Sequence, residues 1–390
     1  MNTRDVSSAQ RTLAFGLIVC GTVLGIAATD LVLPAIPSLP TTLYGTPAQA
    51  QFVLAAYVAG TGIGLLAFGE LGARISPRRL LPASLLLFAI TSFAAVLAQS
   101  INTLIAIRFV QGAAGAAAAV FAPGIIRALY PGTQAVGALG RLGSIEALVP
   151  ALAPIAGAWL LHVFDWKASF VVVGSLALLL ATVLIAMRGS MPTIVRPVAQ
   201  GSYLALLTNA AFLRLALSQA CTLGGLLVVV FSAPAVIVGS MNGALRDFVI
   251  MQVTGVAFFI VAANMSNRLV TRFGATRTIL GGSILSALGG CGILVYALVS
   301  GAHPLALALL FIPMNLGLGF RGPPGFLHAV LASNGDDSRG AALVILAILL
   351  VTALGTAITA PLITLGLVPV ATMAAAISCG SVLLLMFGRR

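Results

Sequence analysis

The sequence predicts an all-α polytopic membrane protein with about 12 transmembrane helices arranged as two six-helix bundles. Three observations lead to this fold class: the composition, the spacing of the apolar stretches, and a similarity between the two halves of the chain. Of the 390 residues, 60% are hydrophobic and only 7% are charged, whereas a soluble domain carries about 25% charged residues. The chain has too few charges to cover a soluble globule, so most apolar side chains must face lipid.

The apolar stretches have the length of membrane spans, since a transmembrane helix needs roughly 20 mostly apolar residues. Short polar or Gly/Pro-containing breaks separate them. The first stretch is too long for the core of a signal peptide, so it is predicted to be retained as a span. The predicted spans cover residues 12–36, 48–70, 80–99, 103–129, 138–162, 167–187, 208–237, 247–270, 278–300, 304–330, 340–364 and 369–388.

The longest polar connection predicts a division of the chain into an N-terminal bundle (1–187), a cytoplasmic linker (188–207) and a C-terminal bundle (208–390). Shifting the sequence by 198 positions superposes Arg74 on Arg272 and Arg141 on Arg339. The halves therefore look like parallel repeats. Such repeats are typical of transporters with a substrate site near the bilayer midplane.

The basic residues predict the orientation of the chain. If the N-terminus is cytoplasmic, the connections on that side collect fifteen arginines, and the opposite side collects only Lys167 and Arg246. Because cytoplasmic loops carry an excess of Lys and Arg, both termini are predicted to lie in the cytoplasm. The net charge of +12 is thus a sign of topology, and no nucleic-acid partner is expected because the basic residues never cluster with aromatic residues.

Three ionisable residues within the predicted spans of the first half are candidates for proton coupling: Asp30, Arg108 and Glu146. A carboxylate in a low-dielectric cavity can take a proton on one side and release it on the other. Arg108 stays charged and needs a partner, for which Asp30, Glu146 or the amide of Gln111 are available. Alternatively, Asp30 only caps its span and Glu146 pairs with Arg141.

Two further arginines, Arg214 and Arg321, are second-line candidates, because their long side chains can also reach the membrane interface from inside a span. The uncharged polar residues within spans are few, which suits an amphipathic ligand better than a sugar. Each of them can also serve simply to join helices. Those expected to line a substrate cavity are Tyr57, Gln111, Gln219, Gln252 and Asn315.

Signatures of enzymes and metal sites are missing from the sequence. The three histidines form no HExxH pattern, no phosphate-binding GxxxxGK[ST] loop occurs, and the four cysteines show no CxxC spacing. We therefore expect a protein that is not an enzyme and that needs no cofactor or metal. We also expect it to be a monomer. Its energy would come from a proton gradient or from the substrate gradient itself.

In several sequence motifs the chain resembles the major facilitator superfamily, and within it the drug/proton antiporters of the bicyclomycin-resistance type. The segment DLVLPAIP, which begins at Asp30, is similar to the D-x-x-LPA-x-P signature of that group. RFVQGAAGAA, which begins at Arg108, is similar to its R-x-x-QG motif, whose arginine is linked to proton coupling. PALAPIAGAWL, with Pro150, Pro154 and Gly157, is similar to the proline/glycine motif of antiporters, and these prolines are expected to bend the helix.

The connection between the second and third spans resembles the family pattern GxLaDRxGRRxxL and reads GELGARISPRRLL, with Gly69, Arg74 and Arg78 retained. The second-half copy, NRLVTRFGATRTIL, contributes Arg272. The resemblance implies that these residues gate the conformational change. The family aspartate of this loop, part of a charge relay that stabilises the outward-open state, is replaced here by Ala73, and Glu70 or Glu146 can take its place.

Together these features predict a proton-coupled secondary transporter of the inner membrane that exports small amphipathic or drug-like compounds by alternating access. The alternative within transport is an exporter or uniporter of a specific metabolite such as a sugar or an amino acid. The alternative of another class is a membrane sensor that binds a ligand without moving it.

Overall fold

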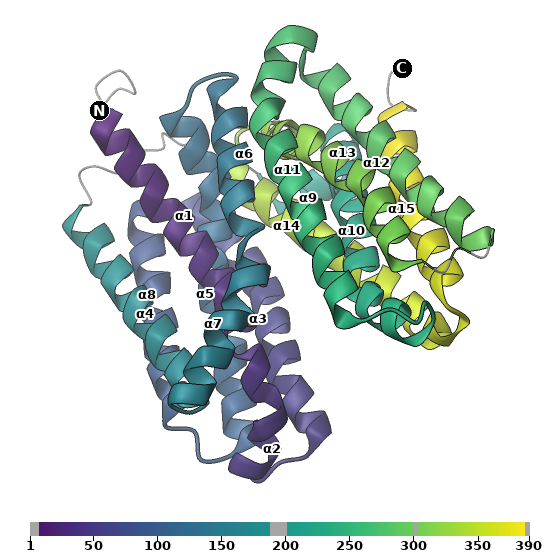
Figure 1. Cartoon of the computed structure of the whole chain (residues 1–390). Coiled ribbons are helices and arrows are strands. Elements are labelled where there is room, and N and C mark those ends of the chain that lie inside the picture. Colours follow the sequence, from purple (N-terminus) through teal and green to yellow (C-terminus); the bar gives the residue numbers. More distant parts are fainter. Residues whose placement is uncertain (1–7, 188–200, 300, 302, 387–390) are drawn as a thin grey trace. The chain divides into compact units, whose positions relative to one another are not determined.

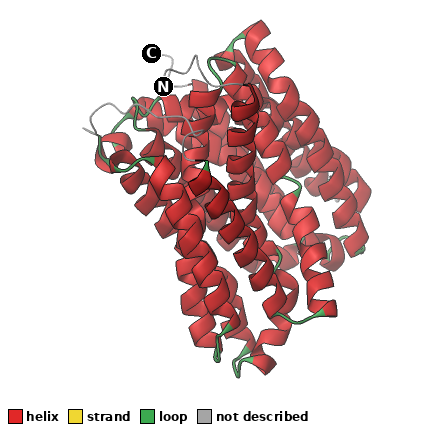
Figure 2. Ribbon diagram, turned by 90° about the vertical axis from the view of Figure 1, so that its left-hand side faces the viewer, coloured by secondary structure: helices red, strands yellow, loops and turns green. Residues whose placement is uncertain are grey.

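A computed structural model describes residues 8–187, 201–299, 301 and 303–386 of the chain. Throughout these residues the chain is built of helices and short loops, and no strand occurs among them (Figure 2). Within the described residues, twelve helical segments are long and apolar enough to cross a membrane. The predicted all-α fold with 12 spans is thereby confirmed.

The first six spans contain eight α-helices, of which α2 is only one turn long, and one 3-10 helix (Figure 1). Their bounds are α1 Ser8–Asp30, the 3-10 helix η1 Leu33–Ser38, α2 Leu39–Thr42, α3 Pro47–Arg74, α4 Pro77–Val96, α5 Ile101–Leu129, α6 Gln134–Glu146, α7 Val149–Val163 and α8 Lys167–Ala186.

The second six spans are preceded by a short helix that lies within the predicted linker. The bounds are α9 Tyr203–Leu207, α10 Ala210–Gly239, α11 Leu245–Phe273, α12 Ala275–Leu298, α13 Pro304–Leu331, α14 Asp337–Thr359, the 3-10 helix η2 Ala360–Leu365 and α15 Leu367–Met386. Residues 188–200 of the predicted linker lie outside the described residues.

Two of the first six spans are not continuous α-helices. The first ends its α-helix at Asp30 and continues as η1, where Pro34 and Pro37 lack the N–H groups that an α-helix needs. The fifth is interrupted at residues 147–148, between α6 and α7. Pro150 follows directly, and because it has no N–H it cannot bond the carbonyl of Glu146 four residues earlier.

The chain forms two compact units. Unit 1 comprises residues 1–131, 145–200 and 335–342, and unit 2 comprises residues 132–144, 201–334 and 343–390. These sets differ from the predicted bundles, because most of α6 belongs to unit 2 and the first residues of α14 belong to unit 1. The predicted division at the linker stays a prediction.

Unit 1 depends on close backbone approach between α3 and α5. A Cβ atom on Gly60 or Gly64 of α3 would overlap backbone atoms of α5, and one on Gly112 of α5 would overlap the carbonyl of Tyr57. Small residues at such positions let two helices pack backbone to backbone. This contact fixes the depth at which Arg108, one turn before Gly112, faces the side chains of α3.

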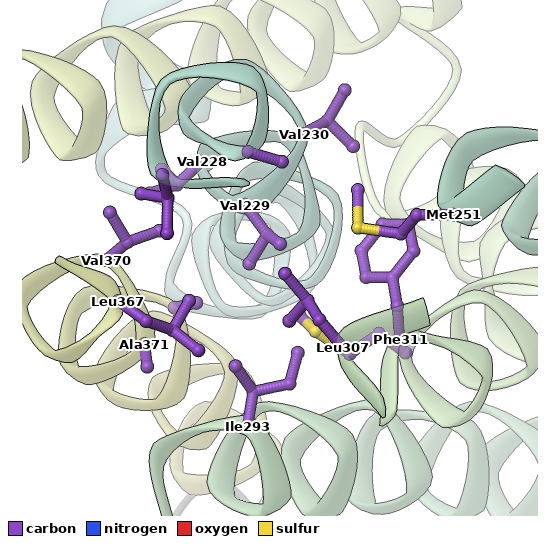
Figure 3. Close-up of a cluster of buried hydrophobic side chains, with 14 of the residues drawn as sticks. Val228, Val229, Val230, Met251, Ile293, Leu307, Phe311, Leu367, Val370 and Ala371 are labelled. Atoms are coloured by element: carbon purple, nitrogen blue, oxygen red, sulfur yellow. The ribbon is translucent and has the colours of Figure 1, made fainter. Parts of the chain in front are cut away.

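Unit 2 has an apolar cluster made by α10, α11, α12, α13 and α15 (Figure 3). Val229, Ile293, Leu307, Phe311 and Ala371 are among its buried members. In α10 the cluster begins at Leu226, so Ser218, Gln219 and Thr222 lie on the part of α10 that precedes it.

Candidate functional site

Arg108 lies in the second turn of α5 and its side chain is completely buried. Its Nη1 donates to Oε1 of Gln111 at 2.8 Å and to the carbonyl of Ala28 at 3.3 Å. Its Nε donates to the carbonyl of Val53 at 3.4 Å. Nη2 is buried and has no hydrogen-bond partner. Arg108 therefore joins α1, α3 and α5 through acceptors that carry no net charge.

Tyr57 covers one face of this guanidinium, with the ring centroid 4.1 Å from Cζ of Arg108. Its hydroxyl donates to the carbonyl of Gly25 at 2.6 Å. On the other side, Nε2 of Gln111 donates to Oγ of Ser92 at 2.6 Å. The aromatic face attracts the cation, and the amide and hydroxyl extend the network to α4.

Asp30 ends α1, and its Oδ2 atom is buried without a hydrogen-bond partner. It lies two residues after Ala28, whose carbonyl accepts a hydrogen bond from Arg108. Glu146 ends α6, and its carboxylate lies within hydrogen-bonding reach of Thr22 on α1. The structure thus places both carboxylates along α1.

The expected ion pair of Arg108 with Asp30 or Glu146 is not found in this structure: among the described residues, no carboxylate lies within 4.0 Å of the Arg108 nitrogens. Of the three partners considered, only the Gln111 amide is in contact with Arg108. Main-chain carbonyls of Val53 and Ala28, which sequence patterns cannot place, accept the other hydrogen bonds of Arg108.

In unit 2, Arg321 of α13 is also completely buried, so the alternative that it reaches the membrane interface is wrong for this structure. Its Nη1 donates at 2.7 Å to the carbonyl of Ser218 and at 2.7 Å to Oγ1 of Thr222, both on α10. Arg214, the other second-line candidate, is half-buried near the start of α10.

The remaining residues expected to line a cavity, Gln219, Asn315 and Gln252, lie in unit 2 and differ in how far their side chains are buried. Gln219 is buried and its Oε1 has no hydrogen-bond partner. Asn315 is buried and donates to the carbonyl of Phe311 at 3.0 Å. Gln252 is half-buried. Of these three residues, only Gln219 is placed close to Arg321: a Cβ atom on Gly325 would lie 2.7 Å from Oε1 of Gln219 and 3.0 Å from Nη2 of Arg321.

The end of α3 carries a cluster of charges in unit 1. The Glu70 carboxylate accepts two hydrogen bonds from Arg339, at 2.7 and 3.0 Å, and one from Arg74 at 2.6 Å. Arg339 also pairs with Asp336 at 2.5 Å. Ion pairs that are bidentate and form a network are the ones that fix geometry.

The same cluster includes an ion pair between Arg127 and Asp337 at 2.5 Å. Of the two carboxylates considered as substitutes for the family aspartate at Ala73, Glu70 lies in this cluster, whereas Glu146 lies beside Thr22. Of the two, Glu70 is therefore the carboxylate that forms ion pairs with arginines in this structure.

The other residues with expected gating roles occupy distinct places. Gly69 is buried in α3, and Arg78 is half-buried in the first turn of α4. Arg272 is exposed in the last turn of α11, where its Cζ lies 5.2 Å from the ring centroid of Phe273. Pro150, Pro154 and Gly157 lie in α7, where a Cβ atom on Gly157 would overlap the carbonyl of Leu31.

Sequence reasoning missed the hydroxyl groups that bind the buried arginines or the side chains in contact with these arginines. Ser92, Ser218, Thr222 and Ser381 look like ordinary small residues of apolar helices. A weak signal was present, because Ser218 and Thr222 are four residues apart and so lie on one helix face. Among the described residues, no group of three His, Cys, Asp or Glu side chains could hold a metal ion.

Comparisons with known proteins show to which proteins the chain is similar. The chain is 25% identical over 312 residues to the bicyclomycin resistance protein homolog of Haemophilus influenzae, covering 78% of this chain and 75% of that protein. It is 28% identical over 298 residues to the chloramphenicol resistance protein of Pseudomonas aeruginosa, covering 75% and 68%.

Among solved structures, the proton:xylose symporter XylE matches with a TM-score of 0.76 at 15% identity, covering 97% of this chain and 95% of that one. The family model of the Major Facilitator Superfamily matches residues 18–360. The chain is therefore a multi-pass membrane transporter, rather than an enzyme, and belongs to the Major Facilitator Superfamily.

Proposed function

We propose that this protein exports small amphipathic or drug-like compounds in exchange for protons by alternating access. The observation that carries the proposal is Asp30: a buried carboxylate oxygen without a partner, at the break of the first span and two residues after Ala28, whose carbonyl accepts a hydrogen bond from the buried Arg108. An ionisable group in that position is costly and is a functional group by default. The resistance proteins among the relatives support the drug-like substrate class.

In this proposal Asp30 accepts the proton, Arg108 is its electrostatic partner and Glu146 is an auxiliary carboxylate. The bonds from Arg108 to the carbonyls of Ala28 and Val53 are long, at 3.3 and 3.4 Å, and Nη2 is unpartnered. A deprotonated Asp30 can therefore draw Arg108 away from weak acceptors at little cost, and protonation releases it. Substrate would then contact Tyr57, Gln111, Gln219, Gln252 and Asn315.

The switch between conformations would depend on the predicted gating residues and on the charge cluster around Glu70. We place the protein in the inner membrane as a monomer with both termini in the cytoplasm, in keeping with the distribution of its basic residues. It would need no cofactor besides the proton gradient.

The test is uptake of radiolabelled chloramphenicol into proteoliposomes with an acidic lumen. Wild-type protein should accumulate the drug only while the pH gradient lasts, and Asp30→Asn should abolish this accumulation. The matched control is Asp165→Asn, because Asp165 is exposed and accepts a hydrogen bond from the backbone N–H of Lys167, which Asn can also accept. Unimpaired gradient-driven uptake by Asp30→Asn would remove Asp30 from the mechanism.

A further inference from the structure

Two of the four cysteines, distant in the sequence, come together in unit 2. Cys291 of α12 and Cys379 of α15 are 88 residues apart, and their sulfur atoms lie 3.7 Å from each other. Both are free thiols, and at this distance one can donate a weak hydrogen bond to the other. Neither residue takes part in the proposed transport mechanism, so the pair has no role assigned so far.

The two helices that carry these thiols approach each other closely. α12 and α15 pack side by side (Figure 1). A Cβ atom on Gly290, directly before Cys291, would lie 3.3 Å from Cα of Ala375 on α15. Ala375 precedes Cys379 by one turn, and small residues at such a contact let helices pack backbone to backbone. A close helix contact next to both cysteines therefore sets the spacing of the two thiols.

The thiol pair lies at the edge of this contact, beside exposed apolar side chains. Leu288 and Val295, three residues before and four residues after Cys291, are 63% and 61% exposed. Leu383, four residues after Cys379, is 51% exposed. Residues three or four apart share a helix face, and exposed apolar faces of membrane spans lie against lipid. Both cysteines are half-buried, so the lipid phase gives access to them.

The helix surface next to both thiols has room for a ligand. A Cβ atom on Gly380, the residue after Cys379, would meet no atom within 4 Å. A Cβ atom on Gly292, the residue after Cys291, would meet only a methyl group of Leu310, at 3.6 Å, which is ordinary van der Waals contact. A group attached to the two sulfur atoms can therefore extend over this surface.

The distance between the sulfur atoms suits a bridge made by one atom. Two bonds of about 2.3 Å from sulfur to a central atom, the length of zinc–thiolate bonds, span roughly 3.8 Å at a tetrahedral angle. The observed distance is 3.7 Å. Zinc itself needs four ligands, and among the described residues no third His, Cys, Asp or Glu completes a metal site. The pair therefore favours a soft, thiophilic atom that takes two sulfurs and brings its own third substituent.

We propose that Cys291 and Cys379 form a dithiol site that binds a trivalent organic arsenical, which bridges α12 to α15. In the reaction with an arsenoxide, two S–As bonds form, the bonding between arsenic and oxygen is lost, and the two thiol protons leave with the oxygen as water. Arsenic stays trivalent, so the step needs no oxidant or reductant. The organic substituent lies on the apolar face beside Leu288 and Leu383. The site is independent of the transported compound and of proton coupling.

The test uses the purified full-length protein and phenylarsine oxide. After incubation and removal of excess probe, 2-mercaptoethanol is added to strip arsenic held by a single thiol, and intact-mass spectrometry counts the phenylarsenic groups that remain. Wild-type protein should retain one group, which 2,3-dimercaptopropanol should remove. Because two linked contacts bind about 100-fold or more tightly than one, Cys291→Ser and Cys379→Ser should each retain none.

Cys20→Ser and Cys221→Ser are the matched controls, since they remove thiols of α1 and α10 and leave the pair intact. Both should retain one group, as wild type does. Thermal unfolding checks that every variant is folded and gives a second readout: the probe should raise the unfolding temperature of wild type and of both controls, and leave that of Cys291→Ser and Cys379→Ser unchanged. No retained group on wild-type protein, or retention that survives in Cys291→Ser or Cys379→Ser, overturns the proposal.

Discussion

At the scale of single residues, the two buried arginines show how a membrane helix accommodates a guanidinium without an ion pair. Arg108 is held by two carbonyls, an amide and the face of Tyr57, whereas Arg321 is held by Ser218 and Thr222. Both retain a buried N–H group without a partner. Each arginine is therefore available to a charged group that arrives during the transport cycle.

Tyr57 contributes to this arrangement in two separable ways. Tyr57→Phe removes the hydrogen bond to Gly25 and should cost about 1 kcal/mol of stability. Tyr57→Leu also removes the aromatic face above Arg108 and should cost about 2 kcal/mol more. Thermal unfolding of the purified variants should give the order wild type, Tyr57→Phe, Tyr57→Leu. Equal unfolding temperatures of the two variants would show that the ring does not stabilise the cation.

At the scale of elements, the contact between α3 and α5 positions the Arg108 network. Gly112→Ala would push a methyl group against the carbonyl of Tyr57, a backbone atom that can move only if the helices separate. We expect a loss of stability of about 1–3 kcal/mol, as for other overpacked sites, measured as a lower unfolding temperature. Gly16→Ala in α1 is the control, because no atom lies within 4 Å of its added Cβ. Equal effects of the two substitutions would refute the close packing.

In the charge cluster at the end of α3, two arginines pair with Glu70, and their exposure predicts which pair contributes more to stability. The side chain of Arg339 is 4% exposed and that of Arg74 is 70% exposed. Arg339→Gln should therefore cost about 1.5–3 kcal/mol and Arg74→Gln less than about 1 kcal/mol. Unfolding temperatures should fall accordingly, and a larger effect of Arg74→Gln would mean that the bidentate pair with Arg339 is not what anchors Glu70.

The elements also show what the sequence can and cannot predict. The 12 spans follow from hydropathy alone, because each helix must satisfy its own backbone in lipid. The end of α1 at Asp30 and the break before Pro150 are local effects of proline. By contrast, the partners that Arg108, Arg321 and Arg339 find on other helices lie 55 to 269 residues away in sequence, and no periodicity within one helix can identify them.

At the scale of the whole molecule, the excess of arginines on one set of loops predicts the topology. In a variant whose four native cysteines are replaced by serine, Tyr44→Cys should react with a membrane-impermeant maleimide added to intact cells. Thr133→Cys should react only after the membrane is opened, because its loop lies on the side of the termini. Both positions are exposed. Labelling of Thr133→Cys in intact cells would show that the chain has the opposite orientation in the membrane.

The central claim is that transport of a drug-like compound is exchanged for protons. It is tested most directly by adding chloramphenicol to proteoliposomes without an imposed pH gradient and following lumenal pH with a trapped dye. The account predicts that the lumen becomes alkaline as the drug enters, and that Asp30→Asn abolishes this change. Entry of the drug through the protein with no change in lumenal pH would contradict the account.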